Sequence, residues 1–169
     1  MHSDSIVVMG VAGCGKSSLA LGLALALGWP MIEGDDFHGP ENKALMAAGT
    51  PLTDKNRAGW LDALAAQLAQ HPAGVVLSCS ALKQRYRDRL RGACTGLRFV
   101  YLRLTPDAAL ARVSGRGGHF FPAGLVASQF EALEPPDAEP GVLSLDATLS
   151  PDALLMTALR WIQRERKAR

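Results

Sequence analysis

The sequence has few cysteines and no excess of charge of either sign. Its three cysteines, Cys14, Cys79 and Cys94, are odd in number and far apart, without the close spacing of metal ligands. This pattern favours reduced thiols in a cytoplasmic protein over disulfides or a zinc site. The formal net charge is +2, which gives no general attraction to nucleic acid or to an anionic membrane surface.

The sequence also lacks an apolar run long enough to cross a membrane. The uncharged stretch at residues 17–32, SSLALGLALALGWPMI, resembles the core of a signal peptide. It is too short for a membrane span, and it directly follows a phosphate-binding motif, so a buried first helix explains it better. The 169 residues are 48% apolar and 20% charged, and we expect one cytoplasmic domain over residues 1–169.

Five short apolar runs alternate with helical patterns along the chain. The runs predict strands at residues 5–9, 30–35, 74–79, 97–104 and 141–147. The expected helix boundaries are a C-terminal cap at Gly28 and N-terminal caps at Thr53 or Asp54, Ser80, Thr105 and Ser150. The alternation predicts an α/β fold with a five-stranded, mostly parallel sheet and helices on both faces. Ligands bind at the carboxyl ends of the strands in such folds.

The strongest motif is GVAGCGKSS at residues 10–18, which satisfies G-x-x-x-x-G-K-[ST] between a predicted strand and a predicted helix. Its backbone N–H groups and the helix N-terminus would hold nucleotide phosphates. Lys16 would reach the β- and γ-phosphates, and Ser17 would ligate Mg²⁺. The predicted nucleotide-binding residues of this loop are Gly10, Gly13, Cys14, Gly15, Lys16, Ser17 and Ser18.

Features of a GTPase or a molecular switch are missing from the sequence. The guanine motif N-x-x-D is absent, since NKAL at residues 42–45 breaks it at the last position. The third predicted strand ends in serines rather than in an acidic residue. These absences argue against catalysis or switching by a GTPase. The acidic stretch EGDDFH at residues 33–38 could hold Mg²⁺ through water or accept a proton from an attacking hydroxyl, and a solvated acidic turn is the alternative.

Further segments follow the loop and GDDFH in a fixed order. They are GTPLTDKNRAGWL (49–61), CSALKQRYRDRLR (79–91) and GRGGHFFPAGLVASQFEALEPP (115–136). Together these segments resemble the gluconokinase family, small kinases related in fold to shikimate and nucleoside monophosphate kinases. The resemblance implies a three-layer P-loop kinase fold with an acceptor-binding segment near residues 36–60 and a mobile lid near 114–124. It also implies that ATP, with Mg²⁺, phosphorylates the 6-hydroxyl of D-gluconate.

The resemblance gives roles to the acidic stretch. Asp35 corresponds to the acidic residue beside the sugar hydroxyl and would orient that hydroxyl or act as its base. Glu33 departs from the aspartate that related kinases often carry, and a role through water on Mg²⁺ is open. His38 would hydrogen-bond the polyol, with a capping or core-edge histidine as the alternative.

The resemblance also gives roles to the cations. Arg57, Lys83 and Arg87 would bind the acceptor's carboxylate or the moving phosphoryl group, as would His119 on the acceptor side. Arg87 has a surface ion pair as its alternative. The remaining pair, Arg112 and Arg116, lies four residues apart and resembles the lid arginines that contact adenine and the phosphates.

Three rival functions remain at this point. A shikimate kinase would carry a glycine run after the third strand, where this chain has SCSALK at residues 78–83. A nucleoside monophosphate kinase fits the GHFF segment poorly. A nucleotide-dependent regulatory protein would keep the loop but show no acceptor-dependent turnover. The resemblance leaves a homodimer open, and no interface can be identified in the sequence.

Overall fold

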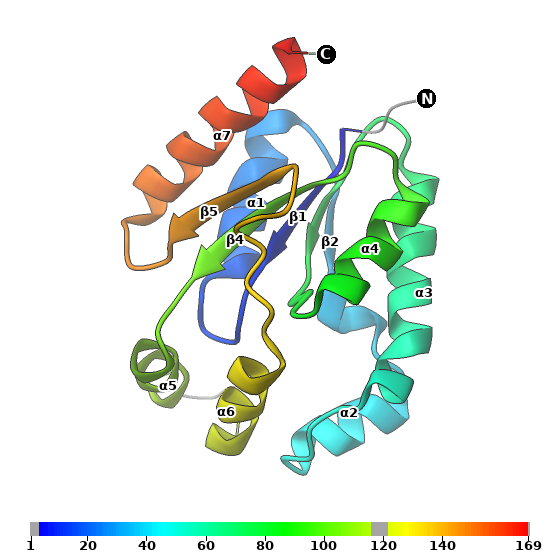
Figure 1. Cartoon of the computed structure of the whole chain (residues 1–169), viewed down its shortest axis with the longest axis vertical. Coiled ribbons are helices and arrows are strands. Elements are labelled where there is room, and N and C mark those ends of the chain that lie inside the picture. Colours follow the sequence, from blue (N-terminus) through cyan, green and yellow to red (C-terminus); the bar gives the residue numbers. More distant parts are fainter. Residues whose placement is uncertain (1–3, 116–121, 169) are drawn as a thin grey trace.

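The structure is a computed structural model that describes residues 4–115 and 122–168. Figure 1 shows a central sheet with helices on both faces. All five strands are parallel, in the order β2-β3-β1-β4-β5. The strands are β1 Ile6–Met9, β2 Met31–Glu33, β3 Val76–Ser78, β4 Arg98–Arg103 and β5 Val142–Asp146. The predicted α/β fold with a five-stranded sheet is therefore confirmed, and the sheet is parallel throughout.

Seven α-helices and one short 3-10 helix connect or follow the strands in the described part of the chain. They are α1 Lys16–Leu27, η1 Gly34–Phe37, α2 Pro40–Ala47, α3 Asp54–Gln70, α4 Gln84–Ala93, α5 Pro106–Ser114, α6 Ala123–Ala132 and α7 Pro151–Lys167. The sequence analysis did not predict α2. It is short, and its one buried residue is the polar Asn42, so it lacks the apolar stripe that identifies a helix.

The central strand β1 divides the core into two parts. Its four residues are fully buried and alternate in direction. Ile6 and Val8 pack with α1 and α7, whereas Val7 and Met9 pack with α3 and α4. Helices thus cover both faces of the sheet, as parallel strands require.

Local capping explains four of the helix boundaries expected from the sequence. Thr53 and Asn56 form a capping box at the start of α3, in which the Thr53 hydroxyl oxygen accepts from the Asn56 N–H at 3.2 Å. Thr105 and Ser150 accept in the same way at the starts of α5 and α7. Gly28 ends α1 with a φ of 68°. These predicted caps are confirmed.

The predicted cap at Ser80 is wrong. α4 begins at Gln84, and Lys83 is its N-cap. The chain after β3 does not enter a helix at Ser80, because other elements use the carbonyl groups of this segment: the Ser80 carbonyl accepts from the Gly10 N–H at 3.3 Å. The carbonyls of Ala81 and Leu82 accept from Arg87 at 2.8 and 3.1 Å.

The carboxyl ends of the parallel strands meet at one edge of the sheet. In Figure 1, α5 and α6 lie beyond this edge on one side, and α2 lies beyond it on the other. No helix in the described residues is long and apolar enough to span a membrane. The three cysteines are buried and form no disulfide.

Candidate active site

The loop of residues 10–15 joins β1 to α1 and leaves the start of α1 open. Gly15 is the N-cap, with a φ of 92°, and no side chain caps the helix. The first turn also has no acidic residue. Its N–H groups therefore remain available for an anion, which the helix dipole favours. The Lys16 ammonium folds back over the loop and donates to the Val11 carbonyl at 3.1 Å.

Gly10 allows the loop to pass close to β4. A Cβ on Gly10 would lie 2.7 Å from the Leu102 carbonyl oxygen and 2.8 Å from the Cys14 sulfur. The Cys14 side chain is 1% exposed and packs beneath the loop. Gly10 and Cys14 thus support the conformation of the loop. We expect them to contribute to nucleotide binding only through their backbone groups.

Three side-chain oxygens gather where α1, β2 and β3 meet. The Ser17 hydroxyl donates to Glu33 Oε2 at 2.6 Å, and its oxygen lies 3.4 Å from the Ser78 hydroxyl oxygen. Hydroxyl and carboxylate oxygens fit Mg²⁺. No group of three or more histidine, cysteine or acidic side chains that could hold a metal occurs among the described residues. A magnesium ion at Ser17 would thus depend on nucleotide phosphates and water for its other ligands.

A cavity of about 490 Å³ joins the loop to the acidic stretch. Its lining includes nine predicted site residues, namely Gly13, Gly15, Lys16, Ser17, Ser18, Glu33, Asp35, His38 and Arg57. The sequence analysis did not assign the other lining residues, which are Ala12, Met46, Leu52, Trp60, Ser80, Val113 and Gln129. The fold thus brings the phosphate loop and the acceptor segment to one space.

Trp60 holds the acidic stretch at residues 33–38 in place. Its indole N–H donates to the Gly34 carbonyl at 2.8 Å, and its ring stacks on His38 with the ring centroids 4.4 Å apart. Burial lowers the pKa of His38 despite the opposing charge of Asp35, and the nearby cations Arg57 and Lys43 lower it further. The imidazole is therefore neutral at pH 7, and it is both buried and part of the cavity lining.

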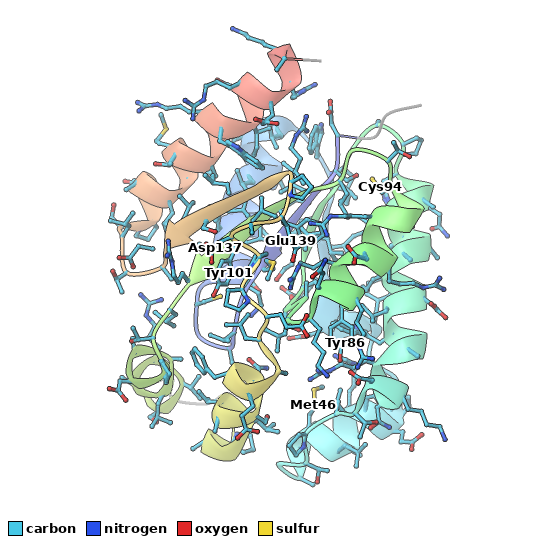
Figure 2. All side chains as sticks on the ribbon, viewed as in Figure 1. Met46, Tyr86, Cys94, Tyr101, Asp137 and Glu139 are labelled. Carbon is cyan, nitrogen blue, oxygen red and sulfur yellow. The ribbon has the colours of Figure 1, made fainter. Side chains whose placement is uncertain are left out.

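Arg57 is held at the cavity by Tyr86. The guanidinium donates to the Tyr86 hydroxyl oxygen at 3.3 Å, and that hydroxyl donates to Asp54. Figure 2 shows Tyr86 on α4 at the end that faces α2. Lys83 also donates to Asp54, at 3.1 Å. Lys83 is not part of the cavity lining, so the structure pairs it with Asp54 outside the cavity.

The structure does not bring Arg87 to the cavity. Its side chain is fully buried and pairs with Glu139, which lies on the segment between α6 and β5 (Figure 2). Its guanidinium also donates to the carbonyls of Ala81, Leu82 and Glu134. The prediction that Arg87 binds the acceptor is therefore wrong: this arginine holds three backbone segments together, and its ion pair is buried rather than on the surface.

A second cavity, of about 590 Å³, adjoins the first at the loop. Both cavities are lined by Gly13, Gly15 and Ser18. Arg112, at the end of α5, lines the second cavity and donates to the carbonyls of Gly13 and Ala147 at 3.2 and 2.9 Å. Its predicted partner Arg116 lies beyond the end of α5, and both Arg116 and His119 fall outside the described residues.

Comparisons with known proteins agree with these features. The shikimate kinase family model matches residues 12–123. The chain is 43% identical to a gluconokinase of Gluconobacter oxydans over 95% of this chain and 92% of the relative. It is 42% identical to the thermoresistant gluconokinase of Escherichia coli, over 83% of this chain and 82% of the relative. The chain belongs to the gluconokinase family.

Solved structures support this membership in the gluconokinase family. A gluconokinase from Sinorhizobium meliloti superposes with a TM-score of 0.90 at 43% identity and covers 97% of this chain and 94% of its own. A deoxyadenosine kinase from M. mycoides has a TM-score of 0.68 at 14% identity, with 95% and 99% coverage. At that identity the second likeness concerns the fold alone, and it agrees with the predicted P-loop kinase architecture.

In this member of the gluconokinase family, α6 also reaches the phosphate loop. The side-chain oxygen of Gln129 accepts from the Ala12 N–H at 2.6 Å. The sequence analysis noted QFEALEPP only as part of the family resemblance and gave Gln129 no role. Nothing local in the sequence connects two residues 117 positions apart.

Proposed function

We propose that this chain is a gluconokinase that transfers the γ-phosphoryl group of ATP to the 6-hydroxyl of D-gluconate, giving 6-phospho-D-gluconate and ADP. The observation that carries the proposal is the single cavity lined by Lys16, Asp35 and Arg57. It sets a phosphate-binding cation, a carboxylate and a guanidinium around one space. The membership in the gluconokinase family supports this acceptor.

On the nucleotide side, the open N-terminus of α1 and the ammonium of Lys16 hold the phosphates and stabilise the charge that develops during transfer. The adjoining cavity, lined by Arg112, Leu149 and Pro151, takes the rest of the nucleotide. Ser17, with Glu33 acting through water, would hold magnesium, which would supply further neutralisation of phosphate charge.

On the acceptor side, phosphoryl transfer needs accurate positioning more than covalent help. Asp35 orients the hydroxyl and takes its proton. Neutral His38 offers a ring nitrogen to the polyol, and Arg57 binds the carboxylate at the other end of the acid. Lys83 and Tyr86 both donate to Asp54, and Tyr86 accepts from Arg57, so Lys83 supports the position of Arg57. A cytoplasmic location and a homodimer remain predictions.

A kinase of another small hydroxy acid is the second candidate, because the shikimate kinase family model matches residues 12–123. Arg57 would serve any acceptor with a carboxylate. Against shikimate stand the segment SCSALK at residues 78–83 and the similarity to gluconokinases over most of the chain. A nucleotide-dependent regulatory protein would have no need for Asp35, His38 and Arg57 in the cavity beside the phosphate loop.

A coupled assay of ADP release tests the proposal. The purified protein is given ATP and Mg²⁺ with D-gluconate, other sugar acids, shikimate or AMP in turn. We expect turnover with gluconate to exceed turnover with every other acceptor, and the product to carry phosphate on the terminal hydroxyl. Higher turnover with shikimate or AMP than with gluconate would show that gluconate is not the substrate. ATP binding without turnover on any acceptor would support the regulatory alternative.

A further inference from the structure

Gln129 is the only described residue of α6 that donates to or accepts from the phosphate loop through its side chain. The backbone N–H of Ala12 can only donate, so the atom of Gln129 that faces it is the side-chain oxygen. The 2.6 Å separation between Ala12 N and Gln129 Oε1 therefore fixes the orientation of the whole amide. The NH₂ group of the same amide points away from Ala12.

The NH₂ group has two hydrogens to donate, and no acceptor for it is found in residues 4–115 and 122–168. Gln129 and Ala12 both line the cavity that also contains Lys16 and Asp35. Among the described residues this donor thus has no acceptor, and it belongs to a side chain that lines the same cavity as the phosphate loop and the carboxylate assigned to the acceptor hydroxyl. A ligand oxygen with negative charge is the partner that such a donor suits.

We propose that Gln129 is a catalytic residue that donates a hydrogen bond from its NH₂ group to an oxygen of the transferred phosphoryl group. Its side-chain oxygen, held by the Ala12 N–H, keeps the amide in the required orientation before the nucleotide binds. Preorganised donors of this kind stabilise the charge of the transition state without reorganisation. The inference rests on the proposed function, because it requires that a phosphoryl group passes through this cavity.

The competing interpretation is that Gln129 only ties α6 to the loop. Two variants separate the alternatives. Gln129→Glu keeps the length and an oxygen that accepts from Ala12, but loses the donor and adds a negative charge. Gln129→Met keeps the approximate volume and loses both functions. Gln67→Glu is the matched control, because Gln67 lies on α3 outside the cavity lining and, in the described part of the chain, its side chain bonds only Gln70.

The main measurement is the affinity for ADP–Mg²⁺ with aluminium fluoride, a mimic of the transferring phosphoryl group, relative to the affinity for ADP–Mg²⁺ alone. We expect both Gln129 variants to bind ADP nearly as the wild type does and to bind the mimic about 10²–10³-fold more weakly, the usual loss for one such donor. Turnover should fall by a similar factor, and Gln67→Glu should change neither quantity.

If Gln129 only connected α6 to the phosphate loop, the variants would give a different result. Equal losses for ADP and for the mimic in Gln129→Met, with near-normal behaviour of Gln129→Glu, would overturn the proposal. Unchanged affinity for the mimic in both variants would also overturn it. This binding measurement needs no acceptor, so it is independent of the coupled assay with different acceptors. If gluconate gave no turnover in that assay, the binding result could still be interpreted.

Discussion

The hydroxyl of Ser17 donates a 2.6 Å hydrogen bond to Oε2 of Glu33. This contact joins the first turn of α1 to the end of β2 and directs a carboxylate at the hydroxyl assigned to magnesium. An aspartate has one methylene fewer, so at this position its carboxylate would reach less far toward Ser17. Groups that orient a metal ligand usually affect metal affinity rather than the chemical step.

Glu33→Gln should therefore raise the Mg²⁺ concentration needed for half-maximal turnover by about 10- to 100-fold. Turnover at saturating Mg²⁺ should fall much less. A magnesium titration of the coupled assay measures both quantities. Glu33→Asp tests the reach of the carboxylate, and Glu41→Gln on exposed α2 surface is the control. An unchanged magnesium requirement in Glu33→Gln would remove Glu33 from the metal site.

Lys16→Ala should abolish most phosphoryl transfer without unfolding the protein. The ammonium bonds only the Val11 carbonyl within the described chain, so its loss costs little stability and removes the cation next to the phosphates. Circular dichroism checks the fold, and ADP release checks turnover. Near-normal turnover of a folded variant would place the nucleotide site elsewhere.

Asp35→Asn should lower turnover with gluconate by about 10²–10⁴-fold, the usual contribution of a positioned base. The variant keeps the size of the side chain and one acceptor oxygen, so ATP binding and folding should remain nearly normal. ATP affinity is measured by titration, and turnover is measured with gluconate varied.

The neighbouring Asp36 supplies the control for this prediction. Asp36 does not line the cavity, and Asp36→Asn should leave turnover close to that of the wild type. A reversed pattern, with Asp36→Asn inactive and Asp35→Asn active, would transfer the role to Asp36. A loss of ATP–Mg²⁺ binding in Asp35→Asn would make Asp35 a residue of the metal site.

Arg57→Ala should raise the KM for gluconate by about 10- to 100-fold, since a hydrogen bond to a charged group contributes about 1.5–3 kcal/mol. Tyr86→Phe keeps the ring but removes the hydroxyl that accepts from Arg57 at 3.3 Å. Its effect should be smaller and in the same direction. The KM for ATP should stay constant in both variants, and an equal rise in both KM values would indicate a general disturbance of the fold instead.

Glu139→Gln should lower the free energy of unfolding by about 3–5 kcal/mol, because it leaves the guanidinium of Arg87 buried without its anionic partner. Chemical denaturation measures this change. The matched control is Asp62→Asn, which removes the exposed partner of Arg89 and should cost about 1 kcal/mol or less. Equal effects of the two substitutions would contradict the structural role assigned to the buried pair.

The contribution of Glu139 also depends on pH. Burial alone would raise the pKa of this carboxyl, but hydrogen bonds from Arg87 and Arg91 outweigh burial and hold the pKa below its ordinary value of 4.5. The stabilisation is therefore complete above pH 4.5 and is lost as the pH falls through the lowered pKa of the folded state. The stability difference between the wild type and Glu139→Gln should shrink over that acidic range.

Local sequence was sufficient for the five strands, for several helix caps and for the phosphate loop. The motif at residues 10–18 specifies its own turn and its own ligand, because its glycines, its lysine and its serine act within one loop. Thr105 and Ser150 could be identified as caps because capping is decided within four residues. Ser80 failed as a cap because its carbonyl is bonded to Gly10, a residue 70 positions away.

Two arginines show most clearly that local sequence does not determine which side chains reach the cavity. The family resemblance gave Arg57 and Arg87 the same role, although Arg87 also had a surface ion pair as its alternative. The packing of α4 against the segment before β5 buries Arg87 with Glu139, whereas Arg57 faces the cavity and bonds Tyr86. Whether an arginine is buried in an ion pair or faces the cavity depends on which carboxylate lies near it in the folded chain. The spacing of residues in the sequence does not specify the distance between those two side chains.

The sequence by itself determined the alternation of strands and helices, the phosphate loop and the family to which the chain belongs. Periodicity, glycine conformation and capping act over a few residues, so they can be evaluated along the chain. Only the tertiary structure decided the contacts of Gln129 with Ala12 and of Glu33 with Ser17. Those contacts join elements that meet at the carboxyl edge of the sheet, and their existence depends on how the helices pack around it.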